Sequence, residues 1–166
     1  DNTSGDNTKV EFAVSVKDKD GDPAAGVLTV RIVDDVPVAK NDTDSIAAGG
    51  KMAAGNVLTG EGTNEGTTNA DVLGADGATV TQVVGTETKA IGATDVQVQG
   101  TYGVLTIRGD GTYSYTRTAG GGGGEPDVFT YTLKDGDTDE KTATLTITIG
   151  DETPAVVIPA AGGDTT

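Results

Sequence analysis

The sequence predicts an all-β protein built as a sandwich of two sheets. Apolar and polar residues alternate along several segments, as in strands that bury one face. The chain contains 26 Gly and 28 Thr among its 166 residues, and these residue types favour turns and pleated surfaces respectively. No long stretch of Ala, Leu, Glu and Lys indicates a helix. About seven short strands with turn signals between them are typical of a sandwich.

The expected strands begin with a hairpin in which residues 12–16 pair with residues 27–33. Further strands are expected at residues 44–47, 79–84, 96–99, 103–108, 112–117, 128–133 and 143–149. In the last of these, Leu145, Ile147 and Ile149 alternate with Thr residues. Segments 60–77 and 120–124 are predicted to be loops, since both are rich in Gly and poor in apolar residues.

An internal repeat indicates how the chain is organised. Residues 12–37 align without a gap with residues 129–154, and ten of the 26 aligned positions are identical. Chance would give roughly two identities at average residue frequencies. We therefore expect residues 1–36 to form the last hairpin of one repeat and a junction. Residues 37–150 would form a complete repeat, and residues 151–166 a second junction with a linker tail.

Composition excludes several classes of function. The formal net charge of −15 argues against a nucleic-acid partner, because binding to phosphates needs a basic face. Acidic membrane surfaces are excluded for the same reason, and no apolar stretch is long enough to insert into a bilayer. The chain has neither Cys nor His, so disulfides and the usual nucleophile–base pairs are missing. We therefore expect no enzyme.

Two Asp-rich turns are candidate calcium sites. Each places carboxylates at positions i, i+2 and i+4, and calcium binds six to eight oxygen ligands. Pro23 and Glu140 stand where an EF-hand needs Gly, so neither turn is an EF-hand. The alternative is a solvated turn, since Asp favours turns without any metal. The candidate ligands are Asp18, Asp20 and Asp22 in the first turn, and Asp135, Asp137 and Asp139 in the second.

Acidic residues around Pro37 form a third candidate site at the junction between repeats. A cation held there would clamp two folded units together, whereas the alternative is an acidic linker kept soluble by repulsion. The candidate ligands are Asp34, Asp35, Asn41 and Asp42, with Asp151 at the corresponding position after the second hairpin.

Three tyrosines bear on whether the chain could bind or cleave sugars. Paired carboxylates are abundant enough for glycoside chemistry, but the chain has no Trp and only four Tyr. Tyr113, Tyr115 and Tyr131 fall at strand spacing and are expected in the core or on a sheet face. A sugar-binding platform of aromatic rings is therefore not expected.

Segments 103–116, 127–137 and 143–149 resemble the VCBS-type and cadherin-like repeats of giant bacterial RTX adhesins. Segments 55–58 and 71–78 resemble the opening of such repeats, with 59–70 as an insertion between them, and 33–42 resembles the junction between repeats. The Gly-Gly-x-Gly-x-Asp nonapeptides of RTX β-rolls are absent from the sequence. The resemblance covers nearly all of residues 10–154.

The resemblance implies an immunoglobulin-like β-sandwich, strung in tandem, stiffened by Ca²⁺ and exposed on the bacterial cell surface. We expect a secreted extender repeat that takes part in cell adhesion or biofilm formation and contacts adjacent repeats of the same chain. The alternative is an adhesion module whose loops bind a glycan or a host protein. The two differ in saturable ligand binding, which only the second would show.

Overall fold

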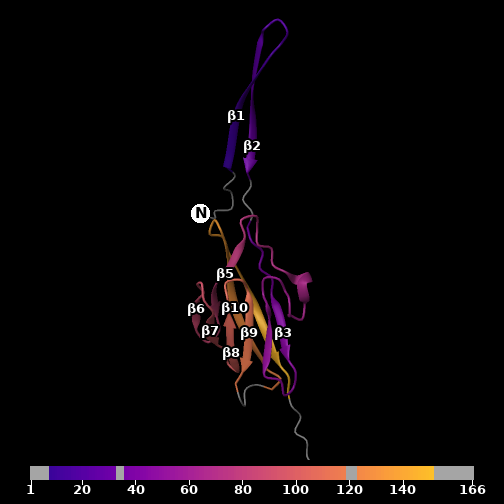
Figure 1. Ribbon diagram of the computed structural model, residues 1–166, viewed down its shortest axis with the longest axis vertical. Coiled ribbons are helices and arrows are strands. Elements are labelled where there is room, and N and C mark those ends of the chain that lie inside the picture. Colours follow the sequence, from indigo (N-terminus) through magenta and orange to yellow (C-terminus); the bar gives the residue numbers. More distant parts are fainter. Residues whose placement is uncertain (1–7, 33–35, 119–122, 152–166) are drawn as a thin grey trace, which may run out of the picture.

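The computed structural model describes residues 8–32, 36–118 and 123–151, and within them the predicted all-β fold is confirmed (Figure 1). In these described ranges, strands account for all the regular structure except one 3₁₀ turn, η1. The elements are β1 (Thr8–Lys17), β2 (Pro23–Ile32), β3 (Asp42–Ile46), β4 (Met52–Asn56), η1 (Gly66–Asn69), β5 (Ala78–Val84), β6 (Thr88–Ala90), β7 (Val96–Gln99), β8 (Gly103–Ile107), β9 (Thr112–Arg117), β10 (Pro126–Asp135) and β11 (Glu140–Ile149).

The sandwich consists of two sheets that share one core. The first sheet has the order β3-β11-β10-β5-β6, and the second has the order β4-β9-β8-β7. All neighbouring strands are antiparallel except β3 and β11, which run parallel with Asp42 opposite Leu145. The predicted strands all exist, because their alternating side chains give each sheet one apolar face.

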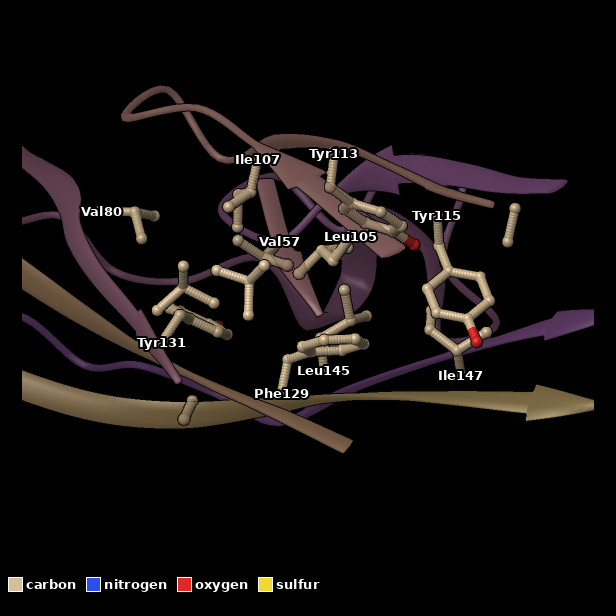
Figure 2. Close-up of a cluster of buried hydrophobic side chains, with 14 of the residues drawn as sticks. Val57, Val80, Leu105, Ile107, Tyr113, Tyr115, Phe129, Tyr131, Leu145 and Ile147 are labelled. Atoms are coloured by element: carbon tan, nitrogen blue, oxygen red, sulfur yellow. The ribbon is translucent and has the colours of Figure 1, made fainter. Parts of the chain in front are cut away.

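The core lies between the facing sides of the two sheets (Figure 2). β10 and β11 each contribute an unbroken row of inward-pointing side chains to the core. Among them, Leu133, Leu145 and Ile147 are at most 1 % exposed. Tyr113, Tyr115 and Tyr131 are buried as the sequence predicted, and the rings of Tyr115 and Phe129 pack edge to face at 6.0 Å. Aromatic rings therefore fill part of a core whose other large side chains are Leu and Ile.

β4 and β6 were not predicted from the sequence. β4 reads Met-Ala-Ala-Gly-Asn and pairs with β9, but its only buried side chain is that of Ala53. β6 has three residues and pairs with the end of β5. Neither segment carries an alternation of bulky apolar residues, so the pairing partner and not the local pattern makes each a strand.

Part of the 60–77 loop covers the free edge of β3. The amide of Asn64 donates to the carbonyl of Thr43 at 2.8 Å. The carboxylate of Glu65 accepts from both the amide and the hydroxyl of Thr43, at 2.8 and 2.6 Å. An uncovered edge would expose unpaired backbone groups to other chains. The loop therefore satisfies both backbone groups of Thr43 on this edge strand.

β1 and β2 form a separate two-stranded sheet beyond one end of the sandwich (Figure 1). Phe12 lies opposite Leu28 in this hairpin, as Phe129 lies opposite Leu145 in β10–β11. The repeat seen in the sequence is therefore a repeat of strand register as well. The division at residues 36 and 150 stays a prediction.

Candidate metal centre

The turn between β10 and β11 gathers the carboxylates that the sequence singled out in its second Asp-rich segment. Antiparallel pairing sets Asp135, the last residue of β10, opposite Ala78, the first residue of β5. The loop just before β5 therefore meets this turn, and it brings in Asp76. One carboxylate oxygen from each of Asp76, Asp135 and Asp137 lies within 4.8 Å of the others.

Buried oxygens in this turn lack hydrogen-bond partners. Asp135 is 7 % exposed, and its Oδ1 accepts the backbone NH of Asp139 at 2.6 Å. Its Oδ2 has no partner among the residues that the structure describes, and neither has either oxygen of Asp139, which is 1 % exposed. A buried carboxylate without partners is costly. These oxygens are free to coordinate a cation.

The electrostatics of the turn favour a positive charge. Burial, with repulsion from Asp137 and Asp135, raises the pKa of Asp139 above its usual range. Two of the causes are the negative charges of Asp137 and Asp135. A bound divalent cation would oppose their effect on the pKa of Asp139. Protons and a cation would thus compete for the same group of carboxylates.

The backbone of the turn is adapted to bring these side chains together. A Cβ atom at Gly136 would lie 2.4 Å from Oδ2 of Asp76, so the glycine leaves room for the Asp76 carboxylate in its present position against the turn. Thr138 has φ of 91°, a value that costs energy for any residue with a side chain. The close approach of Asp76, Asp135 and Asp137 is therefore maintained against strain and repulsion.

The first Asp-rich turn repeats this backbone, but no further carboxylate joins it from elsewhere in the described part of the chain. Oδ1 of Asp18 accepts the NH of Asp22 at 2.9 Å, as Asp135 does from Asp139. Asp18, Asp20 and Asp22 also place one oxygen each within 4.8 Å of one another, but all three are exposed. Hydrogen bonds from Asp20 and from the amides of Asp22 and Gly21 lower the pKa of Asp18. This turn fits a weaker, solvated site.

Among the remaining predicted ligands, those that the structure describes do not join the carboxylates of either Asp-rich turn. Asp34 and Asp35 lie outside the described residues. Oδ1 of Asn41 accepts the NH of Thr144 at 3.0 Å, and Asp42 points into the interior, where it is fully buried. Asp151 is exposed after β11.

Asp42 instead belongs to a buried pair that sequence reasoning missed. The hydroxyl of Tyr131 lies 3.3 Å from Oδ2 of Asp42, 3.1 Å from Oδ2 of Asp71 and 2.9 Å from the carbonyl of Lys40. Burial, with repulsion from Asp71, raises the pKa of Asp42 to about 7. Burial also raises the pKa of Asp71. Each of these two carboxyl groups therefore keeps its proton to a higher pH than an exposed aspartate does.

Asp71 and Asp76 carried no signal of their own in the sequence. Both lie in a segment noted only for its likeness to the opening of a family repeat. Finding them required the register between β5 and β10, which residue spacing alone does not give. A search for acidic residues just ahead of each strand in the first sheet would have found Asp76.

The comparisons with known proteins agree with this architecture. A family model described as "Bacterial Ig domain" matches residues 34–148, and no curated protein matches the chain. None of the helical structure in the described part of the chain is long and apolar enough to cross a bilayer. The match spans most of the chain and coincides with the β3–β11 sandwich, so the chain belongs to the bacterial Ig domain family.

Proposed function

We propose that this chain is a calcium-binding structural extender of a bacterial surface protein. Bacterial Ig-like domains often occur in surface proteins and are commonly extracellular, and the family is typically non-enzymatic. The finer proposal has three parts: Ca²⁺ as ligand, a spacer role, and an adhesin as the parent protein.

The observation that carries the calcium proposal is the unpartnered, buried Oδ2 of Asp135 within the Asp76–Asp135–Asp137 group. An acidic group that is merely solvated would keep its oxygens in water. Hard oxygen donors without nitrogen or sulfur ligands suit Ca²⁺ or Mg²⁺. Ca²⁺ is favoured because it tolerates irregular geometry and takes up to eight oxygens, which the carboxylates and carbonyls of the turn and water can supply.

The position of the group supports a role in ordering successive units. The β10–β11 turn lies at the end of the sandwich nearest the β1–β2 hairpin, whereas β11 ends at the opposite end (Figure 1). A cation there would tie the loop before β5 to the β10–β11 turn. It would brace the end of the unit where residue 36 enters, next to the neighbouring units of the same chain that we propose as its partners.

The adhesin part of the proposal is supported by the resemblance to VCBS-type repeats in segments 103–116, 127–137 and 143–149. That resemblance also favours a secreted protein of the cell surface that acts in adhesion or biofilm formation. The family match by itself supports the Ig fold and no particular parent protein.

A ligand-binding module is the second candidate. A groove of about 360 Å³ is lined by residues 54–56, Glu61, Gly62, Thr112 and Tyr113. The ring of Tyr113 is only 2 % exposed, so it offers no surface on which a sugar could stack. Since loop residues Asn64 and Glu65 are bonded to β3, we favour the extender.

The calcium proposal is tested by thermal melting of the full chain in EDTA and in millimolar CaCl₂. A ligand that binds only the native state adds about 2.7 kcal/mol at a hundredfold excess over its Kd. This corresponds to a rise in Tm of about 10 °C for a domain of this size. Calorimetric titration gives the stoichiometry, and MgCl₂ tests the preference between the two ions.

Two variants make the test specific. Asp76→Asn should reduce the calcium-dependent rise in Tm by more than half, because it removes a charged ligand from the group. Glu125→Gln removes the same charge from an exposed position at the other end of the sandwich and should leave the rise unchanged. A Tm that does not change with calcium would reject the site. Equal reductions of the calcium-dependent rise in Tm in the two variants would reject it as well.

A further inference from the structure

The turn between β8 and β9 presents an Arg-Gly-Asp tripeptide, residues 108–110, that the candidate calcium site does not use. Arg108 and Asp110 are both exposed, and Gly109 between them adds no side chain. A groove of about 710 Å³ borders the turn and is lined by residues 92–95 and 108–110. The turn therefore offers one positive and one negative group beside a recess in the surface.

Hydrogen bonds from two other parts of the chain hold the backbone of this turn. The carbonyl of Gly109 accepts the NH of Val80 at 2.9 Å. The carbonyl of Asp110 accepts from the side-chain amide of Asn56 at 2.9 Å. Gly111 then closes the turn with φ of 81°, a value that glycine adopts without strain. A loop that is already ordered loses little conformational entropy on binding, so the tripeptide is preorganised for a partner.

The carboxylate of Asp110 is directed by the next strand. Its Oδ1 accepts the NH of Thr112 at 2.9 Å. Hydrogen bonds from the amide and the hydroxyl of Thr112 lower the pKa of Asp110, so the group is negatively charged at neutral pH. An exposed carboxylate is a good ligand for a hard divalent cation. Asp110 can therefore complete the coordination of a cation that another molecule holds.

The guanidinium of Arg108 is paired with Asp95, but the pair is exposed. Nε of Arg108 donates to Oδ1 of Asp95, and Nη2 donates to Oδ2 at 3.1 Å. The two side chains are 57 % and 46 % exposed. Exposed ion pairs contribute little free energy, and carboxylates in a drier pocket bind a guanidinium more strongly. Asp95 therefore competes weakly with any acidic partner of Arg108.

We propose that the β8–β9 turn docks into a receptor that supplies a divalent cation for the carboxylate of Asp110 and an acidic pocket for the guanidinium of Arg108. In a chain of net charge −15, a carboxylate alone would distinguish no partner, and the guanidinium beside it supplies the specificity. Integrins of animal cells are receptors with this chemistry. The inference adds a binding role to the proposed extender, so saturable binding is expected, and it does not depend on calcium in the β10–β11 turn.

The test measures binding of the full chain to the immobilised ectodomain of an Arg-Gly-Asp-binding integrin in millimolar MgCl₂. We expect saturable binding that a soluble Gly-Arg-Gly-Asp-Ser peptide displaces. The peptide Gly-Arg-Gly-Glu-Ser, which is longer by one methylene in its acidic side chain, should not displace the chain. Absence of saturable binding, or equal displacement by the two peptides, would overturn the inference.

Two variants test the charged groups, and a third serves as control. Asp110→Glu keeps the charge but moves the metal ligand, so binding should be lost. Because this variant also disturbs the hydrogen bond from Thr112, Arg108→Lys is the second test. It leaves the backbone of the turn intact and should weaken binding about tenfold, since an ammonium lacks the guanidinium fork. Glu87→Asp makes the reverse one-methylene change at an exposed carboxylate and should leave binding unchanged.

Asp95→Asn gives a result that loss of folding cannot imitate. It releases the guanidinium of Arg108 and should strengthen binding about threefold, which is the scale of an exposed ion pair. Unchanged or weaker binding of Asp95→Asn would overturn the inference, because Arg108 would then not be the group that the receptor takes over. Full binding by Asp110→Glu or by Arg108→Lys would overturn it as well.

Discussion

Raising the pH from 4 to 8 should destabilise the sandwich through the carboxyl group of Asp42. Its pKa of about 7 lies above the ordinary 3.8 because the side chain is buried and faces Asp71. The folded protein therefore keeps a proton that the unfolded chain has already released. The stability from this group is fully present below pH 3.8 and is lost as the pH rises through about 7.

The size of the effect follows from the shift. One pKa unit corresponds to about 1.4 kcal/mol, so a shift from 3.8 to about 7 sets an upper limit near 4 kcal/mol. Water entry and relaxation around a charged buried group lower such values. We expect about 2 kcal/mol. Asp42→Asn mimics the protonated form, so it should match the parent at pH 4 and exceed its stability by this amount at pH 8.

The assay is urea unfolding of both proteins at several pH values in EDTA, which keeps calcium from contributing. The control is Asp95→Asn, because a hydrogen bond from Arg108 lowers the pKa of Asp95. The stability that Asp95 contributes is present at neutral pH and lost in acid, so this variant should differ from the parent with the opposite sign. Parallel curves for the parent and Asp42→Asn, within about 0.5 kcal/mol, would refute the reasoning.

Three further substitutions test other features. Thr138→Gly should raise the free energy of unfolding by about 1 kcal/mol in EDTA, because relief of strain at positive φ exceeds the entropy cost of glycine. A lower Tm for the variant than for the parent would mean that the backbone at this residue is not strained. Tyr115→Phe should cost about 2 kcal/mol in urea unfolding, since it removes a 2.6 Å hydrogen bond to buried Asp127; an unchanged midpoint would contradict this. Glu65→Ala should speed amide exchange at Thr43 about tenfold while leaving β10 amides unaffected, because it uncovers the edge of β3; equal rates in parent and variant would show that Asn64 suffices.

The sequence predicted the strands whose own pattern specifies them and missed those specified by partners. Leu145, Ile147 and Ile149 alternate with Thr and identify β11 directly. β4 has only Ala53 to bury and becomes a strand because β9 offers it an edge.

The residues of the candidate site also fall into those that the sequence predicted and those that it missed. Asp135 and Asp137 are neighbours in sequence, so their spacing revealed them, whereas Asp76 joins them only through the β5–β10 register. Asp42 was assigned to the junction for its closeness in sequence to Asp34 and Asp35. The alternation of β3 turns its side chain inward instead. Spacing along the chain was enough to identify the acidic residues as candidates. Strand register and side-chain alternation determine which of them meet in the turn and which point into the interior.

The parallel pairing of β3 with β11 determines how the unit would respond to pulling. The chain enters near β3 and leaves after β11, and these two strands are hydrogen-bonded side by side from Asp42–Leu145 to Ile46–Ile149. Tension applied to the two ends draws β3 and β11 in opposite directions along their length. All the hydrogen bonds between them then bear the load together, in shear, and cannot open one at a time. The unit should yield at high force and lengthen abruptly, which suits a tether under flow.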